Sequence, residues 1–276
     1  MIASIDSSVA LHNGVKMPYL GLGTYQSDND EEVIEAVKHA VSVGYRLIDT
    51  ASIYKNEEGV GKGIRACGIP REALFVTSKV WNSDQGFQGT LDAFEQSLNR
   101  LGLEYLDLYL VHWPVAGKYV DTWRAMEQLY REKKIHAIGV SNFMQHHLEE
   151  LMGHTEIVPM VNQMEFHPYV VQQPLIDFCH KNNIRYQAWS PFMQGKVFGI
   201  EAIKELAEKY QKSVAQLVLR WSLQKGVATI PKSVKAQRIT DNAAIFDFEL
   251  TQADMDFLDG LDRWERIGPH PDNFDF

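Results

Sequence analysis

The feature that most constrains this chain is an alternation of short, β-branched apolar runs with amphipathic helical stretches, repeated eight times. The runs lack polar alternation, as expected for strands of a parallel sheet that is covered on both faces. The helical stretches carry an apolar stripe and have helix boundaries such as Gly44, Gly102 and Ser213. The runs are Tyr19–Gly23, Arg46–Asp49, Leu74–Lys79, Leu106–His112, Ile135–Val140, Val158–Asn162, Ile184–Ser190 and Val227–Pro231.

This alternation fits either a closed (β/α)8 TIM barrel or an open doubly wound sheet. The count of eight and the lack of a linker-like segment favour the α/β barrel, as one domain over residues 1–276. Asn13-Gly14, between two short apolar runs, predicts an N-terminal β-hairpin with a type I′ turn that plugs one end of the barrel. The short C-terminal tail, residues 263–276, has no period, so we expect it to lie over the surface.

Composition and charge exclude several classes of function. The 36 acidic and 27 basic side chains give a net charge of −9, which disfavours nucleic acid and anionic membranes as partners, because both require basic side chains to neutralise phosphates. No apolar run approaches the roughly 18 residues of a membrane span, and we expect no cleaved secretion signal. With Cys67 and Cys179 as the cysteines, we expect no disulfides and a cytoplasmic location. We also expect a monomer and no metal site, since H-E-x-x-H and paired-cysteine patterns are absent.

Ionisable side chains follow three neighbouring predicted strands. The second strand ends in Asp49, with Tyr54 in the next loop, the third ends in Lys79 and the fourth in His112. Active sites of such barrels lie at the C-terminal ends of the strands. Each residue alone is more simply interpreted as a capping, solvated or packing group. Four such groups on adjacent strand ends, of types costly to bury, instead indicate a functional site.

These four residue types suit one kind of chemistry. A Lys79 ammonium near Tyr54 would stabilise the phenolate and lower the pKa of Tyr54, which makes the phenol a better proton donor. Asp49 would keep Lys79 protonated and oriented, and a neutral His112 would donate an N–H to a carbonyl oxygen. Such a site indicates carbonyl reduction, with hydride from a cofactor. A lyase that uses Lys79 as a Schiff-base nucleophile and a non-catalytic cofactor-binding module remain as alternatives.

The sequence contains no dinucleotide or nucleotide fingerprint of the usual kinds, because G-x-G-x-x-G and P-loop patterns do not follow any predicted strand. A nicotinamide cofactor would therefore bind on the ends of strands five to eight. Ser141, Asn142 and Gln163 end strands five and six and would bind the carboxamide, while Trp189 would stack on the ring. The loop after strand seven would hold the pyrophosphate through Ser190, Pro191, Phe192, Gln194 and Gly195.

A small basic cluster follows the eighth strand and opens a helix. It contains Lys232, Ser233 and Arg238. A helix N-terminus with two cations and a hydroxyl is an anion site, and barrels often bind phosphate at this point. The cluster predicts NADPH rather than NADH, because a basic cluster gains little from a 2′-hydroxyl and much from a 2′-phosphate.

Aromatic side chains follow the first, third and fourth strands, beside the candidate catalytic residues. They are Tyr25, Trp81 and Trp113, and together with His112 they would line the substrate pocket. Aromatic walls suit flat, moderately apolar carbonyl compounds. Because the tail is short, we expect the pocket to be open and permissive.

Several blocks of this sequence resemble the aldo-keto reductase family. They run in the family's order over nearly the whole chain: GLGTY, GYRLIDTASIYKNEEGVG, LFVTSKVWN, LDLYLVHWP, IGVSNF, VNQMEFHP, AWSPF and IPKSVKAQRITDN. The resemblance implies NADPH-dependent reduction of aldehydes and ketones to alcohols, with Tyr54 as proton donor in a tetrad with Asp49, Lys79 and His112. The chain looks most like the short-tailed group of bacterial glyoxal and methylglyoxal reductases, 2,5-diketogluconate reductases and protozoan prostaglandin F synthases.

The same resemblance implies further cofactor contacts. It places Lys232, Ser233 and Arg238 on the 2′-phosphate, and Asn242 with its neighbour Asp241 on adenine. Asp241 stands where the family commonly has Glu, and Trp189 where it more often has Tyr. To the predicted cofactor set we add Gly23, Thr24, Asp49 and Val234. Small α-dicarbonyls such as methylglyoxal and glyoxal are the expected substrates, with endoperoxide reduction of the prostaglandin F synthase type as the alternative on the same site.

Overall fold

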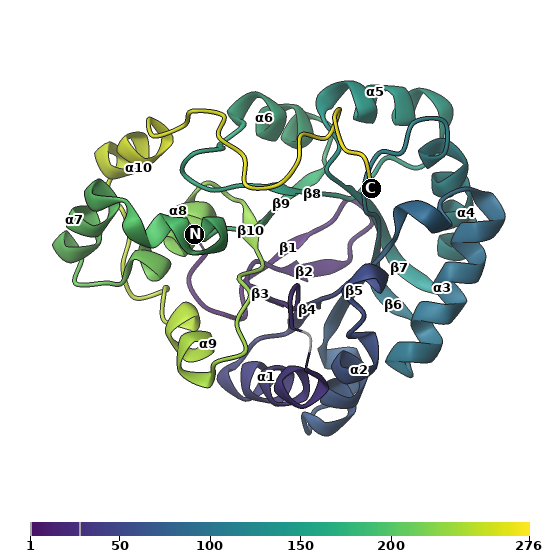
Figure 1. The fold of residues 1–276 in the computed structure, drawn as a ribbon, viewed down its shortest axis with the longest axis horizontal. Helices are drawn as coiled ribbons and strands as arrows, with labels where there is room; N and C mark the ends of the chain where they lie inside the picture. Colours follow the sequence, from purple (N-terminus) through teal and green to yellow (C-terminus); the bar gives the residue numbers. More distant parts are fainter. Residues whose placement is uncertain (1, 28) are drawn as a thin grey trace.

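The computed structural model describes residues 2–27 and 29–276. Eight parallel strands stand side by side in chain order and are surrounded by helices (Figure 1). The predicted (β/α)8 barrel is confirmed. The strands are β3 (Gly21–Gly23), β4 (Leu47–Asp49), β5 (Phe75–Val80), β6 (Leu106–Val111), β7 (Ile135–Ser141), β8 (Val161–Glu165), β9 (Arg185–Trp189) and β10 (Ala228–Thr229).

The barrel closes between its first and last strands. Isolated parallel bridges join Leu20 to Thr229 and Gly23 to Lys232. The approach is tight at Gly23, where a Cβ atom would lie 2.7 Å from the carbonyl oxygen of Ile230. Glycine is therefore required at this position, and closure brings the loop after β10 next to the loop after β3.

Helices follow the strands and bury their apolar stripes against the barrel. As predicted, Gly44 and Gly102 end two of them in the left-handed region, with φ of +114° and +64°, and Ser213 caps a third. The long helices are α1 (Asp30–Val43), α2 (Glu57–Ala66), α3 (Phe87–Leu101), α4 (Tyr119–Arg131), α5 (Gln145–His154), α6 (Gln173–Lys181), α7 (Glu201–Lys209), α8 (Val214–Gln224), α9 (Ala236–Ala243) and α10 (Gln252–Asp259). The short 3-10 helices are η1 (Ser52–Tyr54), η2 (Arg71–Ala73), η3 (Asn82–Asp84) and η4 (Met193–Gly199).

The predicted N-terminal hairpin is present, and it covers the N-terminal end of the barrel. It pairs β1 (Ser8–Ala10) with β2 (Lys16–Pro18), behind the barrel strands in the view of Figure 1. Asn13 Nδ2 donates to the carbonyl oxygen of His136 at the start of β7, and the Arg185 guanidinium at the start of β9 donates to Ala10 O. These contacts hold the plug against the strand starts.

The predicted type I′ turn of this hairpin is wrong. Gly14 has φ of +90°, whereas Asn13 lies outside the left-handed region that a type I′ turn requires. Gly14 N donates to Leu11 O and Leu11 N to Val15 O, which makes a three-residue loop with glycine at the bulge position. Asn13 is instead fixed by its side chain, which accepts from Val15 N at 3.1 Å.

The sixth strand of the barrel begins later than predicted. The apolar run Val158–Asn162 contains Pro159, which has no N–H to give to a ladder, and β8 is Val161–Glu165. Gln163 therefore lies inside the strand rather than after it. Asn162 and Glu165 are also fully buried, and each of these polar side chains makes at least one hydrogen bond, although Asn162 Oδ1 has no partner among the described residues.

The C-terminal tail crosses the end of the barrel that lies opposite the hairpin. In Figure 1 it is the yellow segment that runs from α10 past α6 and α5 to the C-terminus. The expectation that this tail merely covers the surface is therefore incomplete, because it lies over the mouth where the strands end. Among the described residues, no helix is both long and apolar enough to span a membrane.

Candidate active site

The C-terminal ends of β4, β5 and β6 bring the four candidate catalytic residues together. Lys79 Nζ donates to Asp49 Oδ1 at 2.5 Å and lies 3.5 Å from the Tyr54 hydroxyl. The Tyr54 and His112 rings meet edge to face, with centroids 5.8 Å apart. Lys79 and Asp49 are fully buried, whereas Tyr54 is half-buried. A phenol and an imidazole therefore face the mouth above a buried ion pair.

The loop that carries Tyr54 is held by a residue that the sequence analysis missed. Tyr54 ends η1, and the chain turns through Lys55 with φ of +56° before α2 begins. The buried Asn56 side chain donates to Thr24 O and Ser27 O, and it accepts from Thr50 Oγ1 at 2.8 Å. Nothing in the local sequence distinguishes Asn56 from an ordinary turn asparagine, because two of its partners, Thr24 and Ser27, come from the distant loop after β3.

Burial sets the protonation behaviour of the phenol. It raises the pKa of Tyr54 well above the usual value of 10, and the negative charge of Asp49 and the neighbouring Tyr25 raise it further. The expected net lowering of the Tyr54 pKa is therefore wrong for the free protein, because burial and the negative charge of Asp49 outweigh any stabilisation of the phenolate by Lys79.

The ion pair and the imidazole respond to the same burial. Burial raises the pKa of Asp49 and lowers that of Lys79, and their mutual attraction opposes both shifts. Burial, followed by the nearby charge of Lys79, lowers the pKa of His112 well below 6.5. His112 is therefore neutral at physiological pH. Its Nδ1 atom is buried without a hydrogen-bond partner among the described residues.

The predicted carboxamide-binding residues adjoin this ion pair. Gln163 Nε2 donates to Asp49 Oδ2 at 2.7 Å, and Ser141 Oγ donates to Gln163 O at 2.8 Å. Asn142, with φ of +64°, accepts at Oδ1 from Trp189 Nε1 at 3.0 Å. One hydrogen-bonded layer therefore runs from Asp49 across β7, β8 and β9 to the indole of Trp189.

The loop after β9 holds an unusual backbone conformation. Ser190, Met193 and Gln194 have φ between 52° and 55°, and Gly195 has φ of 97°. Non-glycine residues rarely adopt the left-handed region, and they gather at functional sites when they do. Pro191 is buried and Phe192 half-buried. This segment, predicted to hold the pyrophosphate, is therefore the most strained loop of the mouth.

The basic cluster lies across the barrel seam from this layer. Lys232 is exposed, bridges to Gly23 and donates its Nζ to Gln26 O at 2.8 Å. Thr24, next to Gly23, donates its hydroxyl to Asp49 O. The remaining predicted residues lie on α9 or just before it: Ser233 is buried, Val234 half-buried, Arg238 exposed, Asn242 buried, and the exposed Asp241 accepts from Gln237 Nε2.

The predicted aromatic wall is present, and the tail completes it. Trp81 lies edge-on to His112, with ring centroids 5.0 Å apart. The ring centroids of Tyr25 and Tyr54 are also 5.0 Å apart. Phe276 stacks on Trp81 at 5.5 Å with an interplanar angle of 6°, and the nearly buried Trp113 contacts Phe274 at 5.1 Å. The sequence analysis missed Phe274 and Phe276, although the aromatic content of the tail was a signal. The expectation of an open pocket is therefore wrong on the side that Phe274 and Phe276 cover.

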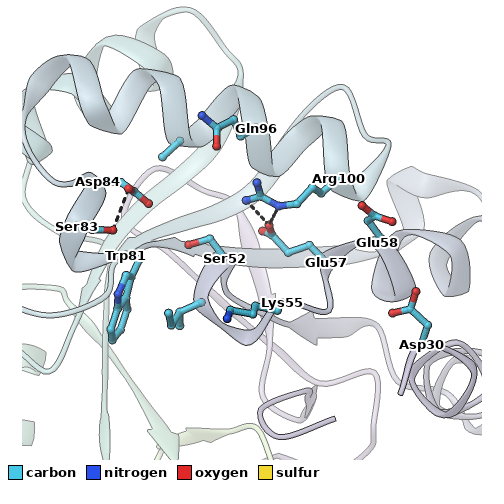
Figure 2. Close-up of a pocket in the computed structure, with 12 residues that line it drawn as sticks. Asp30, Ser52, Lys55, Glu57, Glu58, Trp81, Ser83, Asp84, Gln96 and Arg100 are labelled. Atoms are coloured by element: carbon cyan, nitrogen blue, oxygen red, sulfur yellow. Dashed lines mark hydrogen bonds and ion pairs between the residues drawn. The ribbon is translucent and has the colours of Figure 1, made fainter. Parts of the chain in front are cut away.

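A separate cleft of about 520 Å³ lies beside the mouth, among η1, α2 and α3 (Figure 2). Its lining is largely charged and includes Lys55, Glu57 and Arg100, with Arg100 Nε donating to Glu57 Oε2 at 2.7 Å. It shares Trp81 with the aromatic wall, but Asp49, Lys79 and His112 do not line it. The convergent polar groups therefore place the candidate active site in the barrel mouth.

Near the tail, His146 and His147 of α5 face Asp272, with the three possible ligand atoms within 4.8 Å of one another. Asp272 Oδ1 lies 3.0 Å from His146 Nε2 and 3.3 Å from His147 Nε2. The backbone N–H of Met144 donates to His147 Nδ1, which places the ring proton on Nε2, toward Asp272. These three side chains could together hold a metal ion, and their contacts tie the tail to α5.

Comparison with known proteins agrees with this fold. Residues 19–263 match the Aldo/keto reductase family, and the chain belongs to that family. It is 59% identical over 276 residues to the glyoxal reductase of Bacillus subtilis (strain 168), covering 100% of both chains. It is 54% identical over 269 residues to the 9,11-endoperoxide prostaglandin H2 reductase of Trypanosoma cruzi (strain CL Brener), covering 96% and 95%.

Solved structures agree as well. A crystal structure of a Gox0644 mutant in complex with NADPH superposes with a TM-score of 0.93 at 43% identity, over 98% of this chain and 99% of that one. The chain is therefore an oxidoreductase of the aldo/keto reductase family, with carbonyl reduction and a nicotinamide cofactor as its general chemistry.

Proposed function

We propose that this protein reduces aldehydes and ketones to alcohols with NADPH, and that small α-dicarbonyls such as glyoxal and methylglyoxal are among its substrates. The observation that carries the proposal is the placement of Lys79 Nζ, 2.5 Å from Asp49 Oδ1 and 3.5 Å from the Tyr54 hydroxyl, at the barrel mouth. The 59% identity to a glyoxal reductase supports the small dicarbonyl substrates.

Tyr54 is the proton donor in this proposal. Its raised pKa keeps the phenol protonated at neutral pH, so the proton is present when the substrate arrives. As the carbonyl oxygen gains negative charge, the O–H bond of Tyr54 breaks and the proton passes to that oxygen. Lys79, held by Asp49, then stabilises the phenolate that forms. Asp49 and Lys79 act by orientation and charge and are not consumed.

His112 orients the carbonyl. Its Nδ1 is buried without a partner, and an unpaired buried N–H is rarer than an unpaired acceptor. The neutral ring therefore carries its proton on Nε2. That N–H is the donor that a substrate carbonyl oxygen needs beside Tyr54.

The residues at the rim fit NADPH. Gln163, Asn142 and Trp189 form one hydrogen-bonded layer beside Asp49, and they would hold the nicotinamide. The strained loop of residues 190–195 would bind the pyrophosphate, and the exposed Arg238, with Lys232 and Ser233, the 2′-phosphate. When bound, NADPH would supply the hydride for the carbonyl carbon.

A screen of NADPH consumption tests the proposal. The purified protein should oxidise NADPH with glyoxal, methylglyoxal and an aromatic aldehyde, and Tyr54→Phe should remove that activity while still binding NADPH. Turnover retained by Tyr54→Phe would remove Tyr54 from the acid role. A borohydride-trapped adduct of Lys79 with substrate would favour the Schiff-base lyase instead.

A second candidate substrate is a prostaglandin endoperoxide at the same site. The relative from Trypanosoma cruzi and the extended aromatic wall of Trp81, Trp113, Phe274 and Phe276 support it. Adding the endoperoxide to the same screen compares the two candidates directly. We further propose that the protein works as a monomer in the cytoplasm, with no nucleic acid or membrane partner.

A further inference from the structure

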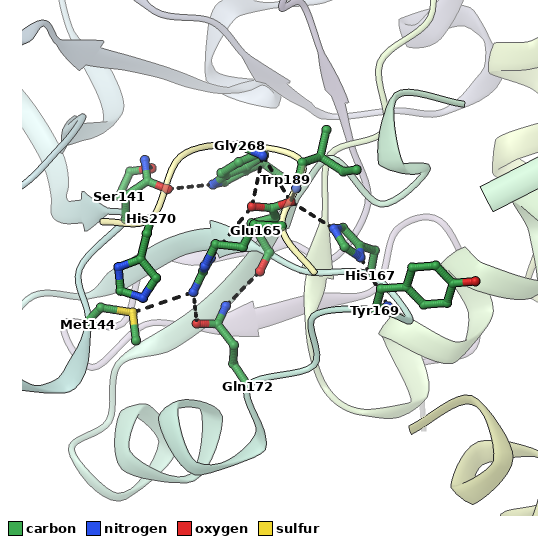
Figure 3. Close-up of polar contacts among 12 residues, drawn as sticks. Ser141, Met144, Glu165, His167, Tyr169, Gln172, Trp189, Gly268 and His270 are labelled. Atoms are coloured by element: carbon green, nitrogen blue, oxygen red, sulfur yellow. Dashed lines mark hydrogen bonds and ion pairs between the residues drawn. The ribbon is translucent and has the colours of Figure 1, made fainter. Parts of the chain in front are cut away.

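Glu165 is a buried carboxylate that the proposed chemistry does not use. It lies two residues after Gln163 at the end of β8, with its side chain fully buried. Figure 3 shows polar groups converging on it from two directions. They are Ile267 N at 2.5 Å, Gly268 N at 3.3 Å, His167 Nε2 at 2.9 Å and the Arg266 guanidinium, whose Nη1 lies 3.7 Å from Oε2.

Three of these four groups belong to the tail. The fourth, His167, receives a hydrogen bond at Nδ1 from Tyr169 N, which places its ring proton on Nε2 and makes it a donor to Glu165. Arg266 Nη2 donates to Gln172 Oε1 at 2.8 Å, and Gln172 Nε2 donates to Glu165 O at 2.9 Å. A single carboxylate therefore ties residues 266–268 to β8 through a closed network.

The hydrogen bonds to Glu165 fix a part of the tail, residues 266–268, that lies at the mouth of the barrel. A Cβ atom at Gly268 would be 2.6 Å from Cη2 of Trp189, so the anchored backbone packs directly against the edge of the indole. Beyond that point the tail turns through an isolated bridge between His270 and Asn273 and contacts α5 through Asp272. It then places Phe274 and Phe276 on the two tryptophans of the wall. Two successive backbone N–H groups on one carboxylate define the direction in which such a segment leaves the barrel.

We propose that Glu165 is a positioning residue that determines substrate specificity through the tail, although it touches neither substrate nor cofactor. By holding residues 266–268, it places Phe274 and Phe276 so that the mouth favours aromatic and long apolar carbonyl compounds over small ones. This inference rests on the proposed carbonyl reduction.

The test compares two substrates in Glu165→Gln, a change that keeps the shape and removes the negative charge. We expect KM for an aromatic aldehyde to rise about 3- to 10-fold, the range of one or two lost aromatic contacts. KM for methylglyoxal and kcat for both substrates should stay within about twofold, because the small substrate does not reach the wall. Hydrogen exchange at Ile267 and Gly268 should accelerate in the same variant.

Glu127 offers a matched control. It is a buried glutamate of α4, and its Oε1 also accepts from two successive backbone N–H groups, those of Glu156 at 3.0 Å and Ile157 at 2.8 Å. That loop leads into the start of β8, at the other end of the barrel. Glu127→Gln should lower stability and leave KM for both aldehydes unchanged.

Removal of residues 274–276 supplies the second arm. Truncation should raise KM for the aromatic aldehyde as Glu165→Gln does, and the combined variant should show no further rise, because both changes act through one segment. Additive losses, an equal loss of kcat with both substrates, or unchanged exchange at Ile267 and Gly268 would overturn the proposal.

Two further readouts keep the outcomes separable. If Glu165→Gln does not fold, Gly268→Ala keeps the carboxylate and displaces the same backbone, because its Cβ would lie 2.6 Å from Trp189 Cη2 and 3.5 Å from Glu165 Oε2. It should give the same KM shift for the aromatic aldehyde, with the Kd for NADPH measured alongside because Trp189 is assigned to the nicotinamide. If the unmodified protein oxidises no NADPH with any aldehyde, the proposed function fails. The exchange measurement needs no turnover, so it judges the anchor separately.

Discussion

The two ends of the barrel contain similar residue types in opposite circumstances. At the N-terminal end, side chains of the hairpin and of a strand start donate to backbone carbonyl groups, as Asn13 does to His136 O and Arg185 to Ala10 O. At the C-terminal end, Asp49 and Lys79 are buried charges, His112 keeps an unpaired nitrogen, and Ser190 has a left-handed backbone. The hydrogen bonds of the hairpin hold the plug in place, while the buried charges, the unpaired nitrogen and the left-handed loop at the mouth indicate a functional site.

The largest expected effect, and the strongest test of a catalytic role for the C-terminal end of the barrel, is the loss of activity in Tyr54→Phe. We expect reduction of methylglyoxal to fall by about 10²- to 10⁴-fold, the usual contribution of a positioned general acid. The Kd for NADPH should change by less than about twofold, since the hydroxyl is assigned to the substrate. Single-turnover oxidation of NADPH and quenching of protein fluorescence by the cofactor measure the two quantities. A comparable loss in both would mean that Tyr54 supports the cofactor instead.

The next effect concerns the basic cluster. Arg238→Ala should weaken NADPH binding by about 10- to 100-fold, since a charge-assisted hydrogen bond contributes about 1.5–3 kcal/mol. NADH binding should remain within about twofold of the unmodified protein, because NADH has no 2′-phosphate. Titration of both cofactors checks this, and equal losses would contradict the 2′-phosphate assignment.

At the opposite end of the barrel, Asn13→Ala sharpens the comparison. The variant loses hydrogen bonds to His136 O and from Val15 N, so the free energy of unfolding should fall by about 1–2 kcal/mol. Denaturant unfolding measures the loss, and kcat/KM for methylglyoxal serves as the control. An accompanying change in kcat/KM would mean that the N-terminal hairpin affects the geometry of the active site at the opposite end of the barrel.

The smallest expected change is in the pH profile, where the rate of the chemical step should not depend on pH around neutrality. Because burial raises the pKa of Tyr54 well above 10 and lowers that of His112 well below 6.5, both groups stay in their neutral forms between about pH 6 and pH 9. The phenol would lose its proton above this window, and the imidazole would gain one below it. The rate of the chemical step, measured in single turnovers, should be flat within it. An apparent pKa near 7 would show that one of the two pKa shifts disappears when the cofactor binds.

Local patterns in the sequence were sufficient for much of the architecture. The eight apolar runs, the left-handed Gly44 and Gly102, and the capping Ser213 each report a preference of a few neighbouring residues. Asp49, Lys79 and His112 could be grouped because the C-terminal ends of neighbouring parallel strands share one rim. One local pattern misled, since Pro159 sits in an apolar run and shifts the start of β8 to Val161.

The sequence by itself determined the number and order of the strands, the residues at their ends and the identity of the ionisable groups, because periodicity, capping and chain order act over short distances. Tertiary structure alone decided the pKa of Tyr54, the Asn56 contacts, and the path that carries Phe274 and Phe276 to the mouth. Desolvation and anchoring depend on which distant groups surround an atom, as when a carboxylate in β8 receives two N–H groups about a hundred residues later in the chain.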